Sequence, residues 1–92
     1  MIVRISSEGQ YRLPGEFLDQ LNAIDNRIVK VVSAGDEVQF RELLAKMLSI
    51  VRKEGKPLGP DEIAQSELIL PHPDITLDEA RELFTNGGLI PG

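Results

Sequence analysis

The chain contains no cysteine and no tryptophan, and only one histidine stands among its 92 residues. Without cysteine there is no disulfide framework, no thiolate nucleophile and no thiolate metal site. Three phenylalanines and one tyrosine make up 4% of the residues, so the core must be mainly aliphatic. The lack of cysteine is compatible with a reducing cytosol, although it does not establish one.

Positive charge and long apolar runs are also scarce. The net charge is −5: residues 1–46 carry six basic and seven acidic side chains, whereas residues 47–92 carry four and eight. No apolar run approaches the roughly 20 residues that cross a bilayer, and residues 1–4 begin a strand-like segment rather than a signal peptide. The excess of acidic side chains argues against nonspecific binding to nucleic acid or to an anionic membrane. It does not exclude a local basic patch.

What the chain does contain is a pair of amphipathic helices within residues 14–55. Apolar residues recur there every three or four positions, which places them on one stripe of each helix. Pro14 suits the first turn of the first helix, and Gly35 is placed to end it. Asp36 is a good N-cap for the second helix, which Gly55 ends. A break this short makes the two helices antiparallel neighbours.

Shorter elements flank this helical hairpin. Residues 2–6 and 10–13 alternate in apolarity and predict an N-terminal β-hairpin. Residues 56–64 hold two prolines, one glycine and two acids, and they predict a loop. Residues 66–70 predict a third strand that the following prolines stop. Residues 76–84 open on a capping box and predict a short C-terminal helix.

The predicted fold class is α+β in a single domain spanning residues 1–92. An N-terminal β-hairpin, an antiparallel helical hairpin, a third short strand and a short C-terminal helix form a two-layer domain. Its small sheet, antiparallel or mixed, lies on the helices. Leu89 and Ile90 are predicted to dock as a final extended piece.

No residue pattern indicates catalysis. His72 lies between two prolines on a predicted loop, with no cysteine or second histidine to complete a zinc site. The acids of residues 74–82 are typical of the first turn and surface of a helix, where the dipole favours them. Asp25 is likewise predicted on a helix surface, and no glycine pattern fits a phosphate-binding loop. We therefore expect no enzyme activity, no metal and no cofactor.

Two features remain for binding. Leu18, Val29 and Val38 lie off the main apolar stripes, so they are either exposed for a partner or buried by the sheet, and burial is the favoured alternative. The N-terminal strand is either an edge that accepts a partner strand or a covered strand, and the covered strand is favoured.

Short segments along nearly the whole chain form an ordered series. They are residues 1–5 (MIVRI), 8–13 (EGQYRL), 34–37 (AGDE), 56–58 (KPL), 66–71 (SELILP), 76–80 (TLDEA) and 88–92 (GLIPG). In content and order, the series resembles the PspA-associated (PspAA) family.

The resemblance implies a small, non-catalytic accessory protein of a phage-shock, or envelope-stress, response in the cytoplasm of bacteria or archaea. The implied partner is a PspA-like coiled-coil protein, which itself binds stressed membranes and could recruit the chain to the inner face of the membrane. No catalytic residues carry over from the family. A coiled-coil partner would offer helices to the helical hairpin, with charged flanks around an apolar seam.

The predicted partner-binding face is the exposed side of residues 36–53, with residues 10–12 beside it. The candidate partner-binding residues are Gln10, Tyr11, Arg12, Val38, Arg41 and Lys46. Charge reversal at Arg41 and Lys46 is expected to weaken the complex. We expect no direct binding to the membrane, and a homodimer through the β-hairpin or an edge strand stays open.

A second interpretation is a DNA-binding antitoxin or transition-state regulator with a swapped hairpin. Residues 9–18 (GQYRLPGEFL) superficially resemble the pattern of those proteins. Against this, residues 1–30 carry four basic and four acidic side chains, which is few cations for neutralising phosphates. Nucleic acid is therefore not the expected partner.

Overall fold

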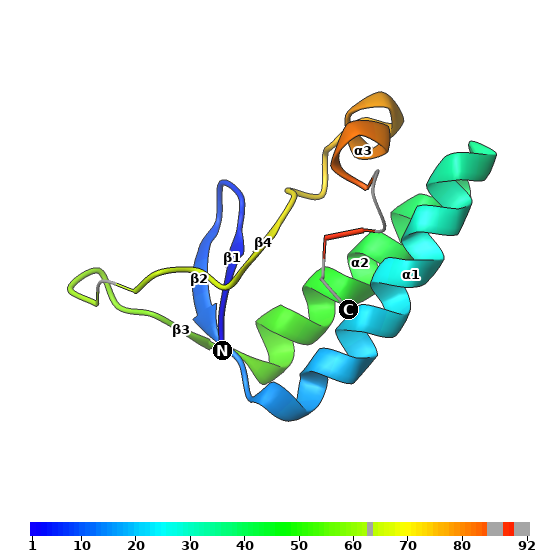
Figure 1. The fold of residues 1–92 in the computed structure, drawn as a ribbon. Coiled ribbons are helices and arrows are strands. Elements are labelled where there is room, and N and C mark those ends of the chain that lie inside the picture. The colour runs from blue at the N-terminus through cyan, green and yellow to red at the C-terminus, as the bar shows by residue number, and fades with distance from the viewer. Residues whose placement is uncertain (63, 85–87, 90–92) are drawn as a thin grey trace.

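The computed structural model describes residues 1–62, 64–84 and 88–89. In chain order its elements are β1 (Ile2–Ile5), β2 (Gly9–Arg12), a 3-10 turn η1 (Gly15–Phe17), α1 (Leu18–Ala34), α2 (Glu37–Glu54), β3 (Lys56–Pro57), β4 (Leu68–Leu70) and α3 (Leu77–Leu83). Figure 1 shows the strands and α3 on the same side of the α1–α2 pair. The predicted α+β class, the N-terminal β-hairpin, the helical hairpin and the short C-terminal helix are confirmed.

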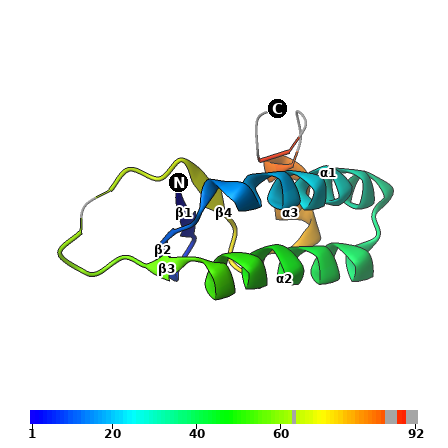
Figure 2. The same cartoon turned by 90° about the horizontal axis from the view of Figure 1, so that it is seen from below.

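Only two residues join α1 to α2. Gly35 takes a left-handed conformation, with φ 74° and ψ 21°, and its N–H donates to the carbonyl of Val32. The N–H of Asp36 donates to the carbonyl of Val31, and its carboxylate accepts the N–H of Gln39 at 3.1 Å. These bonds satisfy the last carbonyls of α1 and the first donors of α2. The two helices therefore lie side by side, as Figure 2 shows.

The N-terminal strand lies inside the sheet, whose order is β3-β2-β1-β4. β1 pairs antiparallel with β2 and parallel with β4, so that Val3 lies opposite Tyr11 on one side and Leu68 on the other. The sheet is therefore mixed, and β4 is the predicted third strand. The favoured prediction of a covered N-terminal strand is confirmed.

Strand β3 corrects the prediction of a loop over residues 56–64, which is wrong for the first two of them. Lys56 and Pro57 pair antiparallel with the end of β2. Pro57 has no N–H to donate, but it lies on an outer strand of the described sheet, where a missing donor is tolerated. The next residue, Leu58, donates its N–H to the carbonyl of Gln10 at 3.0 Å.

The hydrophobic core lies between the sheet and the helical hairpin. Its largest fully buried apolar side chains are Phe40, Ile5, Leu13, Leu21, Ile28, Leu44, Met47, Leu48, Leu70, Val3 and Val51. Phe40 of α2 meets Phe84, the residue that follows α3, with ring centroids 6.3 Å apart and an interplanar angle of 76°. This contact fixes α3 to the end of the hairpin where α1 turns into α2.

The three valine and leucine side chains off the apolar stripes do not share one environment. Val38 is 70% exposed and Leu18 is 38% exposed, whereas Val29 is half-buried against the core. The favoured prediction that the sheet buries all three is wrong for Val38 and Leu18. The reason is that the sheet and α3 lie on one side of the hairpin only.

Asp25 corrects the prediction of a surface position, because its side chain is fully buried. It lies four residues after Leu21 and three before Ile28, so it points to the same side of α1 as these core residues. Its carboxylate accepts the N–H of Leu89 at 3.0 Å. Leu89 packs against the core, as predicted, while Ile90 lies outside the described residues.

Candidate interaction surface

The β1–β2 turn is held to the end of α2 by hydrogen bonds to the carboxylate of Glu8. Arg52 donates from Nε to Oε2 of Glu8 at 2.9 Å and from Nη2 to Oε1 at 2.5 Å, and the Tyr11 hydroxyl donates to Oε2 at 2.6 Å. Arg52 first and Tyr11 second lower the pKa of Glu8, and the carboxylate in turn raises the pKa of Tyr11. The Arg52 and Glu8 side chains are 42% and 30% exposed, so after solvent screening the pair contributes about 1 kcal/mol or less.

Two further residues of β2 hold the segment between β3 and β4. The Gln10 amide donates to the carbonyl of Ala64 and to the hydroxyl of Ser66, both at 2.8 Å. Arg12 pairs with Glu62 at 3.3 Å, and both of these side chains are more than half exposed. Gln10 therefore has a structural role, whereas Arg12 is accessible to a partner.

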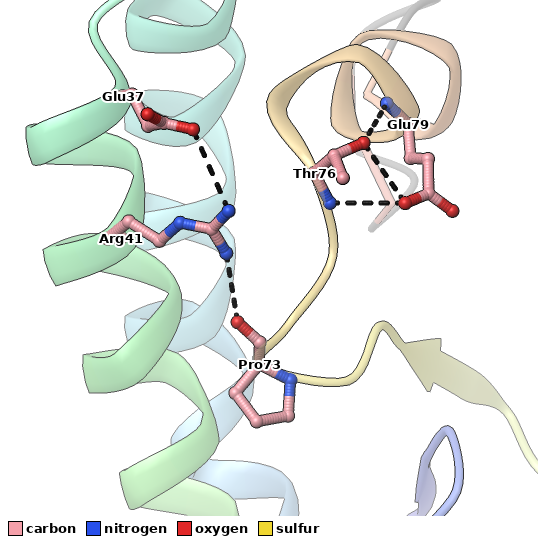
Figure 3. A network of polar contacts seen from close by, with 5 residues as sticks. All are labelled: Glu37, Arg41, Pro73, Thr76 and Glu79. Carbon is pink, nitrogen blue, oxygen red and sulfur yellow. Dashed lines mark hydrogen bonds and ion pairs between the residues drawn. The ribbon is translucent and has the colours of Figure 1, made fainter.

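Arg41 fastens the segment before α3 to α2, as Figure 3 shows. Its Nη1 donates to the carbonyl of Pro73 at 3.0 Å, and its Nη2 lies 3.7 Å from the carboxylate of Glu37. The guanidinium carbon also lies 5.5 Å from the centroid of the Phe40 ring. A charge reversal at Arg41 would break these internal contacts, so a loss of partner binding in that variant would not by itself identify an interface.

Figure 2 views the helical hairpin from the side that faces away from the sheet. Two pockets that share Gln20, Lys46 and Ile50 form a groove between α1 and α2, and none of its lining residues belongs to the fully buried stripes that face the sheet. We call it the outer groove. Its apolar lining consists of Phe17, Ala23, Ile24 and Ile50. Its polar and charged lining consists of Gln20, Arg27, Lys46, Ser49, Lys53 and Glu54.

The six predicted partner-binding residues fall in three places. Gln10, Tyr11 and Arg12 lie on β2, beside the C-terminal end of α2. Val38 and Arg41 lie near the other end of α2, about 20 Å away at a rise of 1.5 Å per residue. Among the six, Lys46 is the residue that lines the outer groove.

The remaining residues of the outer groove are absent from the predicted set, although a signal for them exists in the sequence. Within residues 17–27 and 46–53, most of the lining side chains recur at intervals of three and four. Such intervals keep side chains on one face of a helix. The same intervals also describe the core stripes, so the spacing alone does not say which face is open.

In residues 1–62, 64–84 and 88–89, no three histidine or carboxylate side chains come together in a way that could hold a metal ion. His72 is half-buried beside Pro71. None of the helices described is both long enough and apolar enough to cross a membrane.

Comparison with known proteins identifies one family. The family described as PspA-Associated protein matches residues 1–92, which is the whole of this chain. No curated protein and no solved structure matches this chain.

Proposed function

The chain belongs to the PspA-associated protein family, and on that premise we propose that it is a non-catalytic accessory protein of a phage-shock, or envelope-stress, system. It acts by direct contact with a PspA-type coiled-coil protein. The observation that carries the proposal is the family match over residues 1–92. Membership of this family indicates an accessory role in the Psp system.

The shape of the chain supports a helical partner. A helical hairpin with one uncovered side can accept a further helix, through an apolar seam with charged flanks. In the described residues the polar clusters around Gln10, Glu8 and Arg41 join parts of the chain to each other. They do not converge on a space where a substrate would sit, which favours a binding role over a catalytic one.

The proposed place of action is the cytoplasm, with recruitment to the inner face of the membrane through the partner. A net charge of −5 opposes direct attraction to anionic headgroups. Membrane localisation of this chain should therefore require the PspA-type protein. Imaging the tagged chain in host cells with and without that protein tests this dependence.

The six predicted residues remain the proposed contact residues, and three of them allow clean tests. Arg12, Val38 and Lys46 are exposed, and their side chains hold few or no internal contacts. Substituting each alone should leave the fold intact, whereas Gln10, Tyr11 and Arg41 also hold elements together.

The direct test is complex formation between the purified full chain and the PspA-type protein of the same host. We expect the two to co-elute in size-exclusion chromatography and to bind in calorimetry. Failure to bind at micromolar concentrations would contradict the proposal. A steeply salt-dependent shift of duplex DNA, with no protein complex, would instead favour the DNA-binding interpretation.

A further inference from the structure

We infer that the outer groove is the docking site for an amphipathic helix whose apolar stripe is flanked by acidic residues. The inference rests on the proposed function, in which a PspA-type coiled-coil protein supplies this helix. It places the docked helix on one face of the chain, which includes Lys46 but none of the other five proposed contact residues, and it states which chemistry the partner must present.

The geometry of the groove fits one helix. Its walls are α1 and α2, and its lining extends from Phe17 to Arg27 on one side and from Lys46 to Lys53 on the other. Ten residues of helix span about 15 Å at a rise of 1.5 Å per residue, which is nearly three turns. Packing of one helix into the groove between two others is the arrangement found in helix bundles.

The floor of the groove is apolar and only partly covered. Ile24 is buried with 7% exposed, while Phe17 and Ile50 are half-buried and pack against the core. Ala23 is exposed and, as a small residue, allows a close approach. Figures 1 and 2 show the sheet and α3 on the opposite side of the helical hairpin, so no described element covers this floor.

The rim of the groove has a charge opposite to that of the chain. Arg27, Lys46 and Lys53 line it with only Glu54 as a carboxylate, on a chain whose net charge is −5. The ion pairs among the described residues use Arg12, Arg41, Arg52 and Arg81, and none uses a cation of the groove. Acidic side chains on an incoming helix would complement these three cations.

The apolar floor and the cationic rim together favour an acidic amphipathic helix over other anionic partners. Phosphates of a nucleic acid or lipid headgroups would need cations but not a narrow apolar floor between two helices. The overall acidity of the chain also works against a large anionic surface. A helix with an apolar stripe and acidic flanks can pack its stripe on the floor and pair its acids with the cations of the rim.

The test is a double charge reversal, Arg27→Glu with Lys46→Glu, in the full chain. Both side chains are exposed and lie in the middle of a helix, so circular dichroism and the melting temperature should change little. The control is Arg4→Glu, a single charge reversal at an exposed position of β1 on the sheet, so the double variant carries one reversal more. Binding of each protein to the purified PspA-type protein is measured by calorimetry at low and high salt.

We expect the groove variant to bind about tenfold more weakly or worse at low salt, because repulsion replaces attraction at the rim. The difference should shrink at high salt, since exposed charges are screened. The Arg4→Glu control should bind like the wild type. Equal binding of all three proteins, or weakening by Arg4→Glu alone, would overturn the inference and leave the proposed function standing.

A photoreactive amino acid at Ser49, which lines the groove, identifies what lies there. Mass spectrometry of the crosslink should find a helical segment with acidic residues beside apolar ones. A crosslink to a loop or to a basic segment would overturn the inference. The same photoreactive residue placed at Arg4 serves as the control.

If the PspA-type protein binds no form of the chain, the proposed function fails and the groove is tested with a synthetic probe. The probe is a helical peptide with a leucine stripe flanked by glutamates. Its binding to the wild type, lost in the double variant, would support the groove site; no binding to the wild type would overturn it. Binding of phosphatidylglycerol vesicles that the double variant loses would assign the groove to a lipid surface and would also overturn it.

Discussion

Replacing Phe40 with leucine should loosen α3 from the helical hairpin. Phe40 is fully buried near the start of α2 and meets Phe84 edge-to-face, with 6.3 Å between the ring centroids. Helix α3 has only 7 residues, and an isolated helix of that length is not stable in water. Its position therefore depends on packing, and this aromatic pair is a main contact.

The size of the effect follows from the burial of the two rings. Truncating a buried phenylalanine to alanine costs about 3–5 kcal/mol, a large part of the roughly 5–14 kcal/mol expected for a domain of this length. Leucine keeps much of the volume, so Phe40→Leu should cost about 1–2 kcal/mol. An edge-to-face pair contributes about 0.5–1.5 kcal/mol beyond area burial. A double-mutant cycle of Phe40→Leu with Phe84→Leu should recover that coupling.

Urea unfolding followed by far-UV circular dichroism is the suitable assay, because the chain has no tryptophan. Hydrogen exchange of the α3 amides gives the local readout, and both single variants should speed it. Leu83→Ala is the control: that side chain is 45% exposed, so the change should stay within about 0.5 kcal/mol. A coupling below about 0.3 kcal/mol would refute the role of the aromatic pair in holding α3.

Three further substitutions test a helix N-cap, the glycine that ends α1, and the carboxylate of Glu8. Thr76→Ala removes the side chain that accepts the N–H of Glu79 at 3.1 Å, so it should destabilise the protein by about 0.5–2 kcal/mol; unchanged exchange of the α3 amides would contradict this. Gly35→Ala places a Cβ at φ 74°, 3.2 Å from Arg81, and should cost about 1 kcal/mol; a raised melting temperature would contradict it. The lowered pKa of Glu8 stabilises the fold above the unfolded-state value of 4.5, and this stabilisation is lost as the pH falls through the folded-state pKa. Glu8→Gln should therefore lower stability at neutral pH, and this loss should shrink as the pH falls below 4.5; a loss that does not change with pH would contradict it.

The elements that sequence analysis predicts correctly are those with local signals. Gly35 and Asp36 mark the turn between α1 and α2, because a left-handed residue and an N-cap act within a few positions. The capping box of α3 is local in the same way. Strand β3 is missed because two residues with a proline carry almost no strand signal, and its pairing with β2 comes from residues more than 40 positions earlier.

Which side chains of α1 are buried depends on segments far away in the sequence, so the residue pattern of α1 alone does not reveal it. Asp25 reads as a surface acid, yet the segment at Leu89 lies against it. The candidate surface is harder still to predict. Gln10 looks available until Ser66, 56 positions away, is placed beside it. The outer groove exists because the sheet and α3 pack on the other side of the hairpin, and helical spacing alone does not say which side that is.

During synthesis, the first strand leaves the ribosome long before its parallel neighbour exists. Val3 of β1 pairs with Leu68 of β4, so this pairing closes a loop of more than 60 residues, whereas the contacts within the β-hairpin and between the helices are local. Until residues 68–70 emerge, β1 has an open edge that a strand of another chain can occupy. A delay in the emergence of residues 68–70 from the ribosome should therefore increase misassembly.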